Sequence, residues 1–189
     1  MEFEKVIRER SSIRKFSKKK FDISYILEAI EAANLAPSPG NLPLIRYIIV
    51  ENSEKISKLA EASMQSFIAD APFIVVVCSD KKEAELLYEE RAERYVKHHV
   101  GAAIENFLLK ITDLGLASCW IGAFSDLMVK NILKIPANIE VEALLPVAYK
   151  AETLILKRRP KPPLDPRIYF EEWKNKFQKP PKKLRADVQ

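Results

Sequence analysis

The chain has 189 residues, of which 48% are hydrophobic and 30% are charged, with a formal net charge of +5. This length predicts one globular domain with its own core, and no window approaches the roughly 18 to 20 apolar residues of a membrane span. Cys78 and Cys119 lie in apolar segments without a CxxC motif or a Cys/His cluster. This pattern predicts no zinc or iron–sulfur site and favours reduced thiols in a cytoplasmic protein.

The positive charge is concentrated at the two ends of the chain. Arg8–Lys20 carries seven basic residues and one acidic residue, and Lys157–Arg185 carries eleven basic and three acidic residues. Two basic ends around an acidic middle indicate that the ends bind an anion. A bound phosphate group or a nucleic acid would each satisfy this pattern.

The first predicted helix spans Phe3–Arg10, with Phe3, Val6 and Ile7 facing inward. It ends at the segment RSSIRKF, residues 10–16, which places two arginines and two serines within five residues. Arginine forms bidentate contacts with phosphate, and serine adds hydroxyl donors. The segment is therefore either a phosphate-binding turn or a helix end with solvated charge.

A second helix is predicted to begin at Asp22 or Ser24, with Ile26, Leu27, Ile30 and Ala33 on its inner side. It stops at APSPGNLP, residues 36–43, where prolines, a glycine and an asparagine predict a stiff, shaped loop. The polar side chains and free amides of such a loop could bind a planar ligand, although most loops of this kind are plain connectors.

Arg46–Glu51 is predicted as a strand, and Ser53 as the cap of a third helix that runs to about Ala69 with Met64 inward. Phe73–Cys78 is a continuous apolar run, typical of a central strand that is buried on both faces. The charge-rich segment Ser79–Lys97 predicts a solvated helix.

The segment from His98 to Phe124 is the centre of the chain. Apolar residues recur every three or four positions up to Leu114 and cover most of the helix surface, which predicts a buried helix, and Gly115 is its expected C-cap. The run Ala117–Phe124 is then predicted to place a loop, Trp120–Ala123, at a site in the core. His98 and His99 point about 100° apart on a helix, so they cannot chelate one metal together.

Ser125 is predicted to cap a helix that ends at Leu133, and Val141–Tyr149 to form another apolar strand. Four prolines make Arg159–Arg167 an extended arm, which leads to a short aromatic helix at Tyr169–Phe177. The arm cannot bury this helix locally, so it would pack on a distant part of the chain or on a second subunit. The chain contains no GxGxxG, GxxxxGK[ST] or GxSxG motif.

Several segments, in this order, resemble the motifs of the nitroreductase family of FMN-dependent oxidoreductases. RSSIR at 10–14 resembles the family's R-[RS]-S-[IV]-R motif, and PSPGNL at 37–42 resembles its P-S-x-x-N-x-Q-P-W loop. The segments APFIVVV at 71–77, GAAIENFLL at 101–109 and GLASCWIG at 115–122 keep the family's order, and KRR at 157–159 resembles its K-x-R. Pro43, Leu44 and Ile45 stand where the family has Q-P-W.

The resemblance implies an FMN site and assigns its residues by motif. The implied cofactor-binding residues are Arg10, Ser11, Ser12, Arg14, Pro37, Ser38, Pro39, Asn41, Gln65, Trp120, Ile121, Gly122, Ala123, Lys157 and Arg159. The first and last motifs would hold the phosphate and ribityl chain, and the loop at 37–41 would edge the isoalloxazine from the other subunit. Gln65 would hydrogen-bond the flavin, and Gly122 is the nearest match to the residue whose backbone amide points at flavin N5. No catalytic side chain and no metal ligand is implied.

The resemblance also implies an α+β fold, with a mostly antiparallel central sheet wrapped by helices, in an intertwined homodimer. Residues 1–178 would form a single FMN-binding domain, with the arm 160–178 on the partner subunit and a basic tail at 179–189. The implied reaction is ping-pong hydride transfer from NADH or NADPH, through flavin N5, to nitroaromatics or quinones, without nucleic acid or membrane partners. Dehalogenation or flavin breakdown on the same fold is one alternative, and a basic nucleic-acid-binding module is the alternative of another class.

Overall fold

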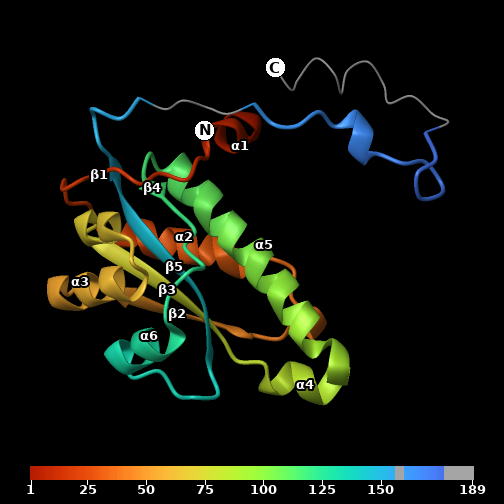
Figure 1. The fold of residues 1–189 in the computed structure, drawn as a ribbon, viewed down its shortest axis with the longest axis horizontal. Coiled ribbons are helices and arrows are strands. Elements are labelled where there is room, and N and C mark those ends of the chain that lie inside the picture. The colour runs from red at the N-terminus through yellow and green to blue at the C-terminus, as the bar shows by residue number, and fades with distance from the viewer. Residues whose placement is uncertain (156–159, 177–189) are drawn as a thin grey trace. The chain divides into compact units, whose positions relative to one another are not determined.

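The computed structural model describes residues 1–155 and 160–176. The chain divides into two compact units, Met1–Leu154 and Ile155–Gln189. The larger unit holds the strands and the long helices (Figure 1). Among the described residues, no helix is long and apolar enough to span a lipid bilayer.

The sheet of the larger unit is antiparallel throughout its named strands. These are β1 (Phe16–Ser17), β2 (Ile45–Val50), β3 (Phe73–Ser79), β4 (Ala117–Ser118) and β5 (Glu140–Lys150). The strand order is β1-β5-β3-β2, and β4 also pairs with β5. The register places Val75 opposite Ile49 on one side and opposite Leu145 on the other. This topology confirms the predicted α+β class and the central position of the FIVVV strand.

The helices of the larger unit lie on both faces of this sheet. They are α1 (Phe3–Glu9), α2 (Ser24–Asn34), α3 (Ser53–Ala62), α4 (Lys82–Tyr88), α5 (Ala92–Asp113) and α6 (Asp126–Leu133). Short 3-10 turns span Pro39–Asn41, Ser66–Asp70, Glu89–Arg91 and Asp165–Arg167.

Successive side chains of β3 enter two different cores, because strand side chains alternate between faces. Val75 and Val77 pack with α2 and α5, whereas Ile74 and Val76 pack with α3 and α6. All seven residues of β3 are buried. The sheet is therefore the middle layer between two helical layers. Because β3 is buried on both faces, its sequence is continuously apolar.

The long helix α5 carries the centre of the larger core. Val100, Ala103, Phe107 and Ile111 are at most 3% exposed, as their spacing predicts. The Asn106 side-chain nitrogen donates to the Ala32 carbonyl oxygen at 3.2 Å, which joins α5 to α2. Gly115 follows the helix with φ of 74°, the left-handed conformation expected of a C-cap glycine.

The prediction for the third helix is wrong at both ends. Its N-cap is Asn52, whose side chain accepts from the Lys55 backbone N–H at 3.0 Å. It ends at Ala62 because the next residues turn away, with Met64 at φ of 52° and 93% exposed. Met64 was expected inward, but the left-handed turn directs it outward.

Three further expectations fail. Phe3 and Ile7 are 70% and 49% exposed, and Leu27 is 49% exposed, although each was expected to face inward. The segment expected as the helix Tyr169–Phe177 forms bends and turns over its described part, up to residue 176. Positive φ angles at Glu171 and Lys174 prevent a helix there.

Candidate functional site

The arginine-serine segment after α1 is held in an extended conformation beside β4. The Ile13 N–H donates to the Ser118 carbonyl oxygen at 2.9 Å, and Ser12 forms a parallel bridge with Ser118. Ile13 is only 5% exposed and packs in a small core with Phe16. Because side chains alternate in extended backbone, burying Ile13 leaves its neighbours Ser12 and Arg14 exposed.

The two arginines of this segment place positive charge near Cys119. Burial raises the pKa of the Cys119 thiol, and the charges of Arg14 and Arg10, with hydrogen bonding from the Ser12 side chain, act to lower it. The Arg10 Nε atom lies 3.2 Å from Glu105 Oε1 on α5. Arg10 is therefore partly neutralised, whereas Arg14 forms no ion pair with any residue that the structure describes.

Ser118 carries an unpaired polar atom in this region. The residue is 4% exposed, and its Oγ atom has no hydrogen-bond partner among the described residues. Leaving a buried hydroxyl unpaired costs roughly 1–3 kcal/mol. A ligand that hydrogen-bonds here would remove this cost, so the orphaned hydroxyl beside Ser12 and two arginines fits an anionic, polar ligand. The sequence signal for Ser118 was its place in the GLASCWIG segment.

The following loop, residues 120–123, is fixed at its second residue. Ile121 exchanges two backbone hydrogen bonds with Leu144 of β5, at 3.1 and 3.0 Å, and is 2% exposed. Its neighbours Trp120, Gly122 and Ala123 are exposed. The loop is thus anchored through Ile121 and presents the other three predicted residues outward.

The corner at Gln65 lies next to the same region. The Gln65 N–H donates to the Ala60 carbonyl oxygen at 3.1 Å, and the Phe67 ring lies 6.0 Å from the Phe16 ring of β1. The nearby Ala62 carbonyl accepts from the Ser125 N–H at 2.8 Å. Three predicted segments, around residues 10–14, 65 and 118–123, therefore meet at one end of the sheet.

The loop at Pro37–Asn41 contacts a different part of α5. It packs on the first half of α5, near His99, whereas Arg10 contacts the same helix at Glu105. Six residues of α-helix span about 9 Å, so the loop and Arg10 contact α5 at places about 9 Å apart along its axis. The last predicted pair, Lys157 and Arg159, lies outside the described residues.

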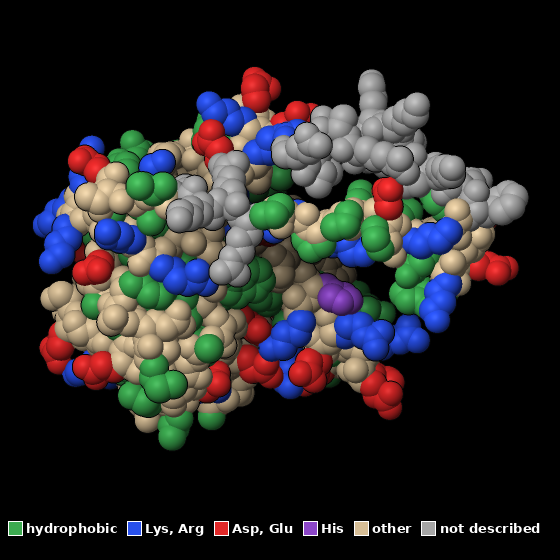
Figure 2. All heavy atoms as spheres, turned by 45° about the horizontal axis from the view of Figure 1, so that its top comes forward, with side chains coloured by type: hydrophobic (Ala, Val, Ile, Leu, Met, Phe, Trp, Pro, Cys, Tyr) green, Lys and Arg blue, Asp and Glu red, His purple; other side chains and the backbone are tan. Residues whose placement is uncertain are grey.

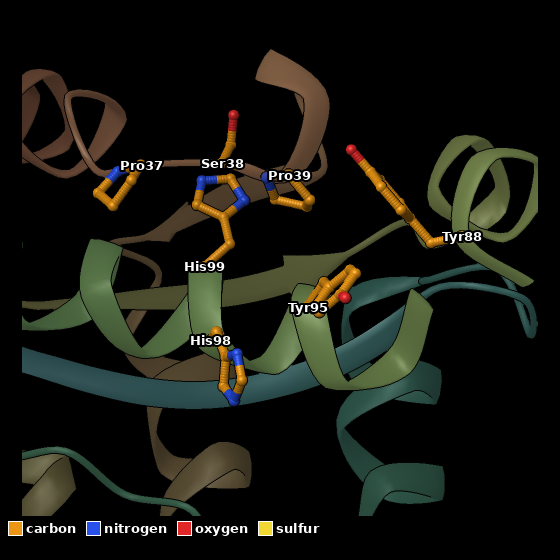
Figure 3. Close-up of a pocket in the computed structure, with 7 residues that line it drawn as sticks. All are labelled: Pro37, Ser38, Pro39, Tyr88, Tyr95, His98 and His99. Atoms are coloured by element: carbon orange, nitrogen blue, oxygen red, sulfur yellow. The ribbon is translucent and has the colours of Figure 1, made fainter. Parts of the chain in front are cut away.

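A cavity of about 370 Å³ lies between this loop and α5. Its lining residues are Pro37, Ser38, Pro39, Tyr88, Tyr95, His98 and His99 (Figure 3). Figure 3 shows His99 pointing toward the loop residues and His98 pointing away from them. Figure 2 shows histidine side-chain atoms at the surface, on a face where basic and acidic side chains are intermixed.

The loop approaches α4 closely at Gly40. Its φ is 59°, and a Cβ there would lie 2.9 Å from the Tyr88 hydroxyl oxygen. Tyr88 and Tyr95 meet edge to face, with ring centroids 5.1 Å apart. The sequence interpretation of Ser79–Lys97 as a solvated helix missed this wall. The predicted helix is broken here: α4 ends at Tyr88 and α5 begins at Ala92, with Glu89 at φ of 48°, so the meeting of Tyr88 and Tyr95 follows from this break and the sequence spacing does not show it.

Comparisons with known proteins agree on one group. Residues 7–69 and 63–149 match the model described as "Nitroreductase family". A protein of Archaeoglobus fulgidus named "Putative NADH dehydrogenase/NAD(P)H nitroreductase" is 32% identical over 150 residues, 77% of this chain and 83% of that protein. The iodotyrosine deiodinase of Thermotoga neapolitana is 25% identical over 158 residues, 75% of this chain and 85% of that protein.

Solved structures show the same fold. A nitroreductase family protein from Clostridium novyi NT has a TM-score of 0.75 and 29% identity, covering 94% of this chain and 97% of that one. The FMN-dependent nitroreductase from Clostridium difficile R20291 also has a TM-score of 0.75, with 23% identity over 89% of this chain and 98% of that one.

Proposed function

The chain belongs to the nitroreductase family, and we propose on this basis that it is an FMN-dependent oxidoreductase. It would use NADH or NADPH to reduce small aromatic acceptors such as nitroaromatics and quinones, in the cytoplasm. The observation that carries the proposal is the meeting of the arginine-serine segment with the orphaned Ser118 hydroxyl. The name of the C. difficile structural neighbour supports FMN as the cofactor.

The residues around Ser118 suit the phosphate and ribityl chain of FMN. Arg14 offers a guanidinium without an ion pair among the described residues, and Arg10, which is paired with Glu105, adds a second positive charge. Ser11 is half-buried and Ser12 exposed, so both hydroxyls can donate to phosphate oxygens. The buried Ser118 hydroxyl suits a ribityl hydroxyl, because both groups donate and accept hydrogen bonds.

When bound, FMN would supply the two-electron, hydride-transfer chemistry of the reaction. The protein would hold the flavin and shield one face of its ring. The exposed loop residues Trp120, Gly122 and Ala123 would cover one face of the ring. The positive charges of Arg10 and Arg14 would favour reduction, because they stabilise negative charge nearby.

The loop at Pro37–Asn41 would reach the flavin of a partner subunit in a homodimer. One observation supports this: α1 exposes Phe3 and Ile7 at 70% and 49%. These two apolar side chains lie one helical turn apart and would offer contact surface to a partner subunit. Light scattering of the FMN-loaded protein should give the mass of a dimer; a folded, flavin-loaded monomer would contradict the shared site.

The test of the reaction is kinetic. Purified protein should contain one FMN per chain, which heat releases and chromatography separates from FAD. Stopped-flow mixing with NADH or NADPH should bleach the flavin, and double-reciprocal plots with a nitroaromatic acceptor should be parallel. A protein reconstituted with FMN that neither nicotinamide reduces would refute the assignment of the donor and leave the FMN site intact.

Reductive dehalogenation is the second candidate, because one relative carries the name iodotyrosine deiodinase. The same cofactor site would serve both reactions. Incubation of the dithionite-reduced protein with an iodophenol should release iodide if this activity is present. Iodide release without reduction of nitroaromatics would select this alternative.

A further inference from the structure

Five exposed lysines lie together around β1, the edge strand of the sheet, and at the end of β5 (Figure 1). This lysine surface consists of Lys15, Lys18, Lys19, Lys20 and Lys150. None of the five forms an ion pair with a residue that the structure describes. Two carboxylates flank them in the sequence: Glu152, and Asp22, whose Oδ1 atom accepts from the Ser24 N–H at 2.8 Å. The surface is therefore strongly positive.

Packing fixes the backbone that carries these lysines. The Lys19 Nζ atom lies 4.8 Å from the centre of the Tyr149 ring, and the Phe21 ring meets Tyr149 edge to face at 6.0 Å. The Ala151 N–H donates to the Lys15 carbonyl oxygen at 3.0 Å. Both rings are half-buried and engaged in this packing, whereas proteins that bind single-stranded nucleic acids offer aromatic rings for base stacking.

The lysine surface borders the segment proposed to hold the FMN phosphate. Lys15 directly follows Arg14 in the chain. Ser118 pairs with Val147 of β5, and Lys150 lies three residues further along the same strand, which corresponds to about 10 Å. A molecule bound to the lysines would therefore lie beside the proposed flavin site.

The number and type of these charges indicate an extended anionic partner. A phosphate group carries at most about two negative charges, and Arg10 and Arg14 already supply two positive charges to it in the proposed site. An ammonium group is a hydrated point charge without the bidentate geometry of arginine. Lysines therefore favour long-range attraction over a fixed contact, as in the small, weak interfaces of electron-transfer proteins, whose encounter is steered by complementary charge.

We propose that the lysine surface docks a small acidic protein that carries one electron, and that this carrier is a second electron donor beside the nicotinamide. Two reduced carriers would dock in turn, and each would give one electron. With one proton from solvent, the two electrons convert FMN to its reduced anion, and both carriers leave oxidised. The proposal rests on the proposed function, because it needs FMN bound beside Ser118.

The experiment measures electron transfer from a probe carrier to the FMN-loaded protein in the absence of oxygen. The probe is an acidic plant-type [2Fe–2S] ferredoxin, reduced beforehand and freed of reductant. Loss of the EPR signal of its reduced cluster, followed by rapid freezing, gives the rate. Wild type is compared with Lys18→Glu/Lys20→Glu and with the matched control Lys55→Glu/Lys82→Glu, which makes the same charge change at exposed positions of α3 and α4.

We expect Lys18→Glu/Lys20→Glu to slow the transfer by at least about 10-fold at about 10 mM salt, because electrostatic steering raises association rates by about 10- to 1,000-fold. The control variant should slow it by less than about threefold, through long-range charge alone. Raising the salt to about 100 mM should narrow the difference, since the Debye length falls from about 30 Å to about 10 Å. Reduced methyl viologen, a small cation, should reduce the flavin of either variant at least as fast as that of the wild type.

Equal slowing in the two double variants, or a wild-type rate that salt does not lower, overturns the docking surface and leaves the lysines as protection of the β1 edge. Binding of a single-stranded oligonucleotide that Lys18→Glu/Lys20→Glu abolishes, without fast transfer from ferredoxin, also overturns the proposal and assigns the surface to nucleic acid. If Lys18→Glu/Lys20→Glu does not take up FMN, the salt dependence of the wild type decides.

The flavin absorbance of each sample separates this proposal from the proposed function. A wild-type protein that cannot take up FMN contradicts the proposed function. An FMN-loaded protein whose flavin is bleached by dithionite but not by reduced ferredoxin contradicts only the docking of a carrier.

Discussion

Replacing Arg14 with alanine tests whether this side chain binds the cofactor or is only a solvated charge after a helix end. Arg14 is exposed and forms no ion pair with the described residues, and the anchoring of its segment belongs to Ile13 and Phe16. An exposed substitution of this kind changes the free energy of unfolding by at most about 0.5 kcal/mol. The variant should therefore fold like the wild type.

The cost of Arg14→Ala should fall on FMN instead. A hydrogen bond to a charged group is worth about 1.5–3 kcal/mol, which corresponds to a rise of about 10- to 150-fold in the dissociation constant. Arg10→Ala should cost less, because Glu105 already neutralises part of the Arg10 charge at 3.2 Å.

The assay is a titration of apoprotein with FMN, followed by quenching of flavin fluorescence, alongside urea unfolding. Lys18→Ala is the matched control, since it removes an exposed positive charge from the same basic segment. It should weaken FMN by less than about threefold through long-range charge alone. Equal effects of Arg14→Ala and Lys18→Ala, or none for either, would refute a direct contact between Arg14 and phosphate.

Three further variants test the fold by urea unfolding. Phe107→Ala, at a position with no exposed surface, should destabilise by about 3–5 kcal/mol, and a loss below 1 kcal/mol would contradict its central place. Ser125→Ala removes the N-cap of α6 and should lower the free energy of unfolding by about 1 kcal/mol. An unchanged free energy would mean that the cap does not stabilise the helix. Lys97→Met breaks contacts at 2.8–2.9 Å with Glu140 and Glu142 and should cost about 1 kcal/mol at pH 7. Hydrogen bonding from Lys97 holds the pKa of Glu140 below its usual value. The stability that this pair contributes is therefore present above about pH 4.3 and is lost as the pH falls through the pKa of Glu140 in the folded protein. An equal difference in unfolding free energy between wild type and Lys97→Met at pH 7 and pH 3 would contradict this.

The strands and the long helix were predictable because their patterns report burial directly. The apolar run of β3 and the three-four spacing of α5 each follow from the number of faces that are buried. Ser125 and Gly115 were found from capping chemistry, which depends on a few adjacent residues. These features are local, so the sequence alone contains them.

The errors concern features decided by distant contacts. Nothing local distinguishes Met64 from an inward residue, since its exposure follows from a left-handed turn at the end of α3. The cavity at Tyr88 and Tyr95 depends on a loop some fifty residues earlier in the chain. The Ser118 hydroxyl and the His99 Nδ1 atom, which lack hydrogen-bond partners in the part of the chain that the structure describes, are likewise invisible in the sequence, because packing decides which partners a buried atom meets.

The order of the strands has a consequence for synthesis on the ribosome. β3 pairs on one side with β2, which precedes it closely, but its other edge pairs with β5, more than 60 residues later. While those residues are being translated, the hydrophobic edge of β3 is unprotected and can pair with other nascent chains. Slowing translation after residue 80 should therefore increase aggregation, and a chaperone that holds the emerging β2–β3 hairpin should suppress it.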